Sequence, residues 1–80
     1  MPKIQWEDLP RDTWHHLLRR VRQRECPEAG LVELMIWRDT EPSAPDGDWF
    51  KRFEGFILVG NGAIPKSFLT PDMAATGQEI

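Results

Sequence analysis

The sequence has 80 residues, 40% of them hydrophobic and 29% charged, with a net charge of −3. This composition is typical of a folded globular protein and excludes global disorder. A chain of this length forms one domain with one modest core and little room for a deep pocket. No stretch approaches the roughly 20 apolar residues that cross a bilayer, so we expect no membrane contact.

The only cysteine, Cys26, cannot form an internal disulfide, which favours a reducing compartment. The start, Met1-Pro2-Lys3, is followed by polar and acidic residues rather than an apolar run, so we expect no secretory signal. We therefore place the protein in the cytoplasm, and its small size favours a bacterial or phage origin.

The first half of the chain predicts helices. Ile4-Gln5-Trp6 alternates and predicts a short strand or an extended arm. A first helix is expected from Pro10 to Arg24, because proline suits the first helical position. Its apolar residues recur at the spacing of one helix face, namely Trp14, Leu17, Leu18 and Val21.

A second helix is expected from Pro27 to Arg38, apolar over most of its circumference and therefore central in the fold. Gly30 weakens its first turn by about 1 kcal/mol relative to alanine. The short connection between the two helices predicts an antiparallel helical pair.

The second half predicts β-structure. Trp49 to Phe53 alternates, as an edge strand or an irregular segment does, and Gly55 allows a turn or bulge. The continuous apolar run Phe56 to Val59 predicts a buried central strand. Gly60-Asn61-Gly62 supplies the positive φ angles of a hairpin turn.

The remaining residues predict an edge strand and a helical turn. Ala63 to Leu69 is the expected edge strand, since Pro65 has no backbone N–H to donate. Thr70 to Met73 has the pattern of a helix cap followed by proline, and Gly77 would stop that helical turn. Residues 78–80 are expected to fray.

The predicted fold is α+β. Two antiparallel helices pack on a small antiparallel β-hairpin or three-stranded sheet, with a short C-terminal helical turn. Residues 1–80 form a single domain, with a helical half at about 10–38 and a β half at about 49–69.

No pattern for catalysis or cofactor binding emerges. His15 and His16 point about 100° apart on a helix and cannot share one ion, and a zinc site needs at least three protein ligands. Cys26 lacks the neighbouring base of a thiol nucleophile. Gly60-Asn61-Gly62 lacks the ending of a phosphate loop, and Asp46-Gly47-Asp48 lacks the other ligands of a calcium loop. We expect no cofactor, no metal and no enzymatic activity.

Basic residues are the first candidate for binding. Residues 11–24 hold five arginines and one acidic residue, Asp12, in an otherwise acidic chain. They could contact phosphates, or they could form a solvated helix face that pairs with the acidic remainder. The candidate residues are Arg19, Arg20, Arg22 and Arg24, with Lys51, Arg52 and Lys66 as additions.

Aromatic residues are the second candidate. Trp49, Phe50 and Phe53 lie beside two basic residues, as in the centre of many protein interfaces. A core this small could equally require all three rings, and the sequence leaves both alternatives open.

The stretch Trp49-Phe-Lys-Arg-Phe, followed by Gly60-Asn-Gly-Ala-Ile-Pro-Lys-Ser-Phe-Leu69, resembles a family of small uncharacterised bacterial proteins. That family has the pattern Trp-aromatic-Lys-x-Phe-Gly-x-Phe, then Gly-x-Gly-x-x-Pro-Lys-Thr-Phe-Leu. Here Glu54-Gly55 departs from the Phe-Gly order by one place and Ser67 replaces threonine. The resemblance implies no activity and no catalytic residue, only that Pro65 to Phe68 matters to the fold.

These patterns predict a small cytoplasmic, non-catalytic interaction module that binds another protein through the basic helix or the segment Trp49 to Phe53. The alternative is a nucleic-acid-binding regulator that uses the basic first helix.

Overall fold

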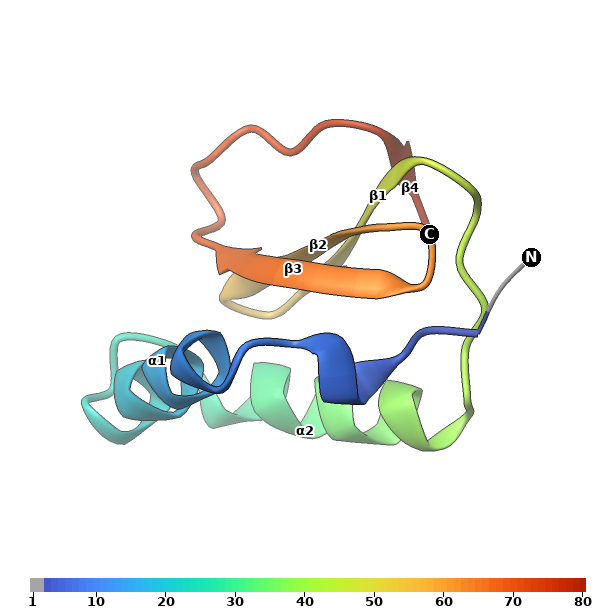
Figure 1. The fold of residues 1–80 in the computed structure, drawn as a ribbon. Helices are drawn as coiled ribbons and strands as arrows, with labels where there is room; N and C mark the ends of the chain where they lie inside the picture. The colour runs from blue at the N-terminus through green and yellow to red at the C-terminus, as the bar shows by residue number, and fades with distance from the viewer. Residues whose placement is uncertain (1–2) are drawn as a thin grey trace.

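The computed structural model of the protein describes residues 3–80, so Met1 and Pro2 lie outside it. Two α-helices form one layer, and a four-stranded mixed sheet forms the other (Figure 1). The elements in chain order are the 3₁₀ helix η1 Trp6–Asp8, α1 Arg11–Arg22, α2 Glu28–Asp39, β1 Asp48–Phe53, β2 Phe56–Asn61, β3 Ile64–Leu69 and β4 Gln78–Glu79. The α+β class is confirmed, but the predicted antiparallel hairpin or three-stranded sheet is wrong, because the sheet has four strands and one of its pairings is parallel.

Both helices begin one residue later than predicted. Pro10 and Pro27 are the N-caps of α1 and α2, with ψ of 138° in each case, rather than the first helical residues. Helix α1 ends at Arg22, and Arg24 then turns the chain with a left-handed φ of 62°. Glycine usually occupies a left-handed position at the end of a helix. Because no glycine marks the end of α1, the predicted helix continued to Arg24.

The sheet has the strand order β3-β2-β1-β4. Strand β2 is central and β3 lies at an edge, as predicted, and both pairings of β2 are antiparallel. The prediction of an edge strand or an irregular segment from Trp49 to Phe53 is wrong, because β1 is regular and lies inside the sheet between β2 and β4. A short strand or an extended arm was expected at Ile4-Gln5-Trp6, but Trp6 begins the 3₁₀ helix Trp6–Asp8.

The predicted C-terminal helical turn and frayed end are wrong. The Met73 N–H donates to the Thr70 carbonyl at 3.0 Å and closes one turn, after which no helix follows. The chain then reaches β1, where the Ile80 N–H donates to the Phe50 carbonyl at 2.9 Å. Gly77 allows this approach, since a Cβ there would overlap the Asp48 backbone.

The sequence predicted that Gly60-Asn61-Gly62 forms the hairpin turn, but the two glycines have different structural roles. Gly62, with φ of 57°, forms the hairpin turn together with Ala63. Gly60 lies in β2, at a bulge, where a Cβ would overlap the ring of Trp49. The first glycine therefore makes space for a side chain, and the turn begins two residues later.

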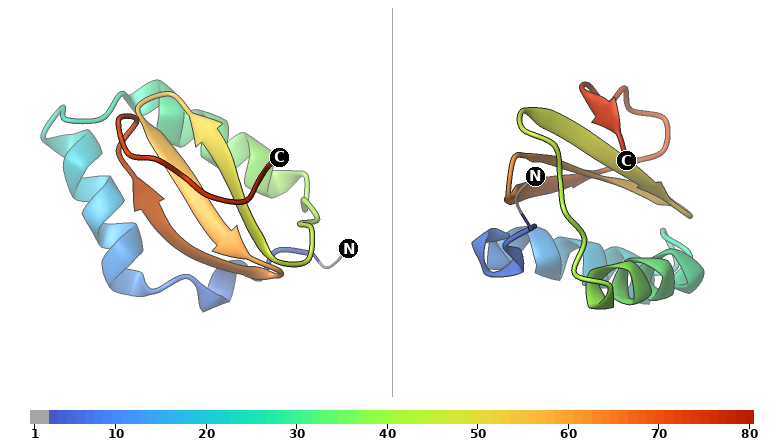
Figure 2. Two further views of the ribbon diagram at one scale, coloured as in Figure 1. Left: turned by 90° about the horizontal axis from the view of Figure 1, so that it is seen from above. Right: turned by 90° about the vertical axis from the view of Figure 1, so that its right-hand side faces the viewer.

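The core lies between the sheet and the helices. Its fully buried side chains include Trp49, Phe56 and Leu58 from the sheet and Leu17 and Leu34 from the helices. Helix α1 packs on β3 and α2 packs on β1, and the helices diverge from the loop that joins them (Figure 2). Each helix thus makes its main contacts with the sheet.

The opposite face of the sheet is covered as well. Phe50 and Ile57 point to this face and are only 9% and 3% exposed, yet neither belongs to the main core cluster. The C-terminal segment 70–77 crosses this face (Figure 1). The segment therefore covers a small second apolar region.

Gly30 marks a close approach of α2 to the sheet, which gives the first prediction. A Cβ at Gly30 would overlap the Glu54 carbonyl oxygen and lie 3.0 Å from the Phe56 ring. We expect Gly30→Ala to lower the free energy of unfolding by about 1–3 kcal/mol through overpacking. This loss should outweigh the gain of about 1 kcal/mol in helix propensity. Urea unfolding followed by circular dichroism measures the difference.

Gly62→Ala is the matched control. Its Cβ would meet nothing within 4 Å, so only the left-handed φ opposes it, at a cost of about 1 kcal/mol. If Gly30→Ala were as stable as the unaltered protein, α2 could not lie this close to the β1–β2 turn.

Candidate functional site

The outer face of α1 carries the exposed arginines of the predicted site. Arg19 and Arg22 lie on one side of this helix with His15 and Leu18, and the four line a shallow hollow of about 340 Å³. Both arginines are exposed. Within residues 3–80 the ion pairs are Lys3–Glu41 at 3.4 Å and Arg52–Glu79 at 2.9 Å. Pairing with the acidic remainder was one of the two alternatives for the α1 arginines, and none of these arginines forms an ion pair in the described part of the chain.

The other two candidate arginines, Arg20 and Arg24, lie elsewhere. Arg20 is half-buried on the inward side of α1, and Arg24 follows the end of the helix. The positive charge of Arg20 acts on Cys26 and Asp72. The pKa of Asp72 is lowered mainly by a hydrogen bond with the Thr70 side chain and only in small part by Arg20. Basic residues in the last turn also stabilise a helix through its dipole, a structural role that Arg20 can fulfil without a ligand.

The aromatic candidates belong to the interior. Trp49 is 0% exposed on the helix side of β1, and Phe50 is 9% exposed on the other side. Phe53 packs in the core with its ring 5.8 Å from that of Trp37. Of the two alternatives that the sequence left open, burial supports the core role, and these rings do not form an exposed contact patch.

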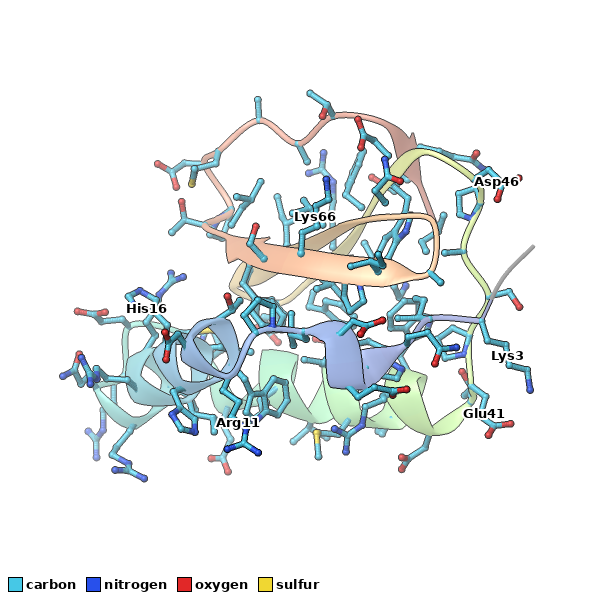
Figure 3. All side chains as sticks on the ribbon, viewed as in Figure 1. Lys3, Arg11, His16, Glu41, Asp46 and Lys66 are labelled. Carbon is cyan, nitrogen blue, oxygen red and sulfur yellow. The ribbon has the colours of Figure 1, made fainter. Side chains whose placement is uncertain are left out.

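The remaining basic candidates are separated by the sheet. The Lys51 ammonium lies 5.4 Å from the centroid of the Trp37 ring, on the helix side. Arg52 lies on the opposite side, 5.7 Å from the Phe50 ring centroid and paired with Glu79. Lys66 also points away from the helices (Figure 3). The predicted residues therefore occupy three surfaces. Arg19 and Arg22 share the outer face of α1, Lys51 lies on the helix side of the sheet, and the exposed Arg52 and Lys66 lie on its opposite face.

Sequence reasoning missed a pocket between η1, α1 and α2. It has a volume of about 330 Å³ and is lined by Trp6, Glu7, Leu9, Arg11, Trp14 and Arg38. The Arg38 guanidinium carbon lies 6.0 Å from the centroid of the Trp14 ring. The sequence assigned Trp14 to the core stripe and Trp6 to an extended arm. Both rings are only half-buried, and the sequence pattern does not show this partial exposure, which is what makes them walls of a pocket.

Cys26 lies in an apolar setting, as a structural thiol does. It is 2% exposed, with its sulfur 3.8 Å from the carbonyl oxygens of Pro27 and Gly55. Burial raises the pKa of the Cys26 thiol, and the charge of Arg20 offsets only part of this effect. His15 and His16 are exposed on α1. Among residues 3–80, no three His, Cys, Asp or Glu side chains gather as metal ligands would.

The raised pKa and the burial of Cys26 predict slow thiol chemistry. At pH 8 we expect dithionitrobenzoate to react at least about tenfold more slowly with the folded protein than with the protein in urea. Because the folded-state pKa is raised, the stability contributed by the neutral thiol is present below the unfolded-state pKa. It is lost as the pH rises through the folded-state value.

An added surface thiol provides the control for this measurement. Ala29 is exposed near the start of α2, so the Ala29→Cys variant should show one fast and one slow equivalent. Two fast equivalents in native buffer would contradict the buried, protonated state of Cys26.

Comparison with family models, with curated proteins and with solved structures finds no match for this chain. The resemblance of Trp49–Leu69 to a family of small bacterial proteins therefore stays a prediction. No helix within residues 3–80 has the length and apolar character needed to span a membrane.

Proposed function

We propose that this chain is a small, non-catalytic interaction module of the cytoplasm that binds an acidic region of another protein through the outer face of α1. One observation carries the proposal. Arg19 and Arg22 are exposed side by side in an otherwise acidic protein, and neither has an ion-pair partner within residues 3–80. An acidic partner would supply the missing carboxylates through charge-assisted hydrogen bonds.

Exposed apolar side chains in the helical layer also favour a protein partner. Leu18 lines the same hollow as the arginines, and on α2 the side chains of Val32 and Ile36 are 50% and 63% exposed. Exposed aliphatic side chains contribute to protein interfaces by burying apolar area. They contribute little to contacts with phosphates.

The alternative function is nucleic-acid binding by Arg19, Arg20, Arg22 and Arg24, and the same unpaired arginines favour it. The overall charge of −3 opposes it, because a polyphosphate chain is repelled by the acidic remainder of the protein. Arg20 is half-buried and Arg24 lies beyond the end of α1. Both facts further reduce the basic surface that α1 can offer to a nucleic-acid strand.

Charge reversal tests the protein-binding function. We expect the unaltered protein to retain a defined partner from extracts of its host. The double variant Arg19→Glu with Arg22→Glu should lose it, with affinity reduced at least about a hundredfold once the two like-charge contacts replace attractive ones. Quantitative mass spectrometry of the bound fraction, followed by calorimetry with the purified partner, measures the effect.

The matched control carries the same charge change on the other face of the sheet, in the double variant Arg52→Glu with Lys66→Glu. It should retain the partner. Equal binding by the α1 variant and the control would remove α1 as the contact surface. Retention on heparin or RNA at about 50 mM salt, lost in the α1 variant, would support the nucleic-acid alternative, because phosphate contacts are strongest at low salt.

A further inference from the structure

The pocket at Trp6 and Trp14 lies at one end of the arginine-bearing face of α1. Arg11, His15, Leu18 and Arg22 are spaced by four, three and four residues. This spacing places them along one side of a helix. Arg11 belongs to the pocket, and the other three line the hollow. The two depressions therefore lie along one side of α1.

The chemistry of the pocket is apolar within and cationic at its edge. The two indole rings and Leu9 form apolar walls, and Arg11 and Arg38 add two positive charges against one carboxylate, that of Glu7. Neither guanidinium takes part in an ion pair among residues 3–80. Arg11 projects from the start of α1 away from the sheet (Figure 3). Such a site fits a bulky apolar group that carries, or lies next to, an anion.

The walls of the pocket are held by the core. Trp6 packs edge-on against Trp37 at 5.8 Å between ring centroids, and Trp14 packs against Phe68 at 6.2 Å. Phe53 and Phe56 connect Trp37 to Phe68, with centroid distances of 5.8, 5.1 and 5.4 Å along this path. Both indoles are thus anchored to one continuous set of aromatic rings. A pre-formed site of this kind binds with little loss of conformational entropy.

We propose that the pocket and the outer face of α1 together bind an extended acidic peptide segment of the partner protein. One bulky apolar side chain of that segment enters between Trp6 and Trp14, and an adjacent carboxylate meets Arg11 and Arg38. A second acidic group meets Arg19 and Arg22. This inference rests on the proposed function, since it specifies what the partner presents to the same face.

The dimensions of the helix set the spacing of the motif. From Arg11 to Arg22, α1 rises about 16 Å, which corresponds to about five residues of extended chain. The apolar residue with its neighbouring carboxylate and the second acidic group should therefore be about four to six residues apart. Glu7 and Asp12 flank the pocket end of this path. A peptide with a few carboxylates tolerates them better than an oligonucleotide charged at every phosphate.

Synthetic hexapeptides test this inference. The probes are acetyl-Phe-Glu-Ser-Ser-Glu-Glu-amide and its reversed sequence, titrated into ¹⁵N-labelled protein to several millimolar. For at least one probe we expect saturable shifts of the indole N–H signals of Trp6 and Trp14, while the signal of the buried Trp49 stays in place. Replacing the phenylalanine of the probe by serine, or its glutamates by glutamines, should abolish saturation.

Two substitutions in the protein locate the contact. Arg11→Gln should weaken binding of the probe about tenfold, the effect of losing one charged hydrogen-bonding partner. Lys66→Gln, on the opposite face of the sheet, should leave binding unchanged. The overall spectrum of each variant shows that it is folded.

Several outcomes would overturn the inference. These are no saturation with either probe, equal affinity for the glutamine probe, unchanged binding by Arg11→Gln, or tighter binding of hexauridylate to the same indole signals. Failure of the probes with continued loss of the partner in the Arg19→Glu, Arg22→Glu variant would remove the peptide site alone. If the unaltered protein itself retained no partner, the proposed function would be removed as well.

Discussion

The burial of the Trp49 indole is the constraint on which the rest of the structure depends. The ring is fully buried above Gly60, in space that any Cβ at that position would fill. Its N–H donates to the Gly62 carbonyl at 2.8 Å, so the only polar atom of the ring is satisfied. A buried indole N–H without a partner would be strongly destabilising. One side chain thereby ties β1 to the bulge in β2 and to the β2–β3 turn.

From Trp49 the aromatic packing extends into the helical layer. The ring centroid of Trp37 in α2 lies 6.4 Å from that of Trp49, and the Trp37 ring also packs against Trp6. Aromatic rings belong to the core between the helices and the sheet, and the two helices diverge from the loop that joins them. One depression of the surface lies at the helical layer, where Trp6 and Trp14 are only half-buried.

The basic side chains on the two faces of the protein differ in whether they form ion pairs. On the side of the sheet that faces away from the helices, Arg52 stacks on Phe50 and pairs with Glu79 of the C-terminal strand. On α1, Arg19 and Arg22 have no such partner among residues 3–80. Exposed ion pairs contribute little to stability, so the absence of one costs the fold little. It leaves the α1 charges available to another molecule.

The sequence by itself determined the elements whose patterns repeat locally. Helix α1 follows from apolar periodicity, α2 from a largely apolar circumference, and the central strand β2 from the continuous apolar run Phe56 to Val59. The edge position of β3 follows from Pro65. The basic character of α1 is likewise visible before folding. The tertiary structure alone decided the pairing of β4 with β1, the space that Gly60 leaves for Trp49, and the pocket at Trp6 and Trp14. Each of these depends on atoms far apart in the chain, and local propensity carries no information about which distant groups will meet.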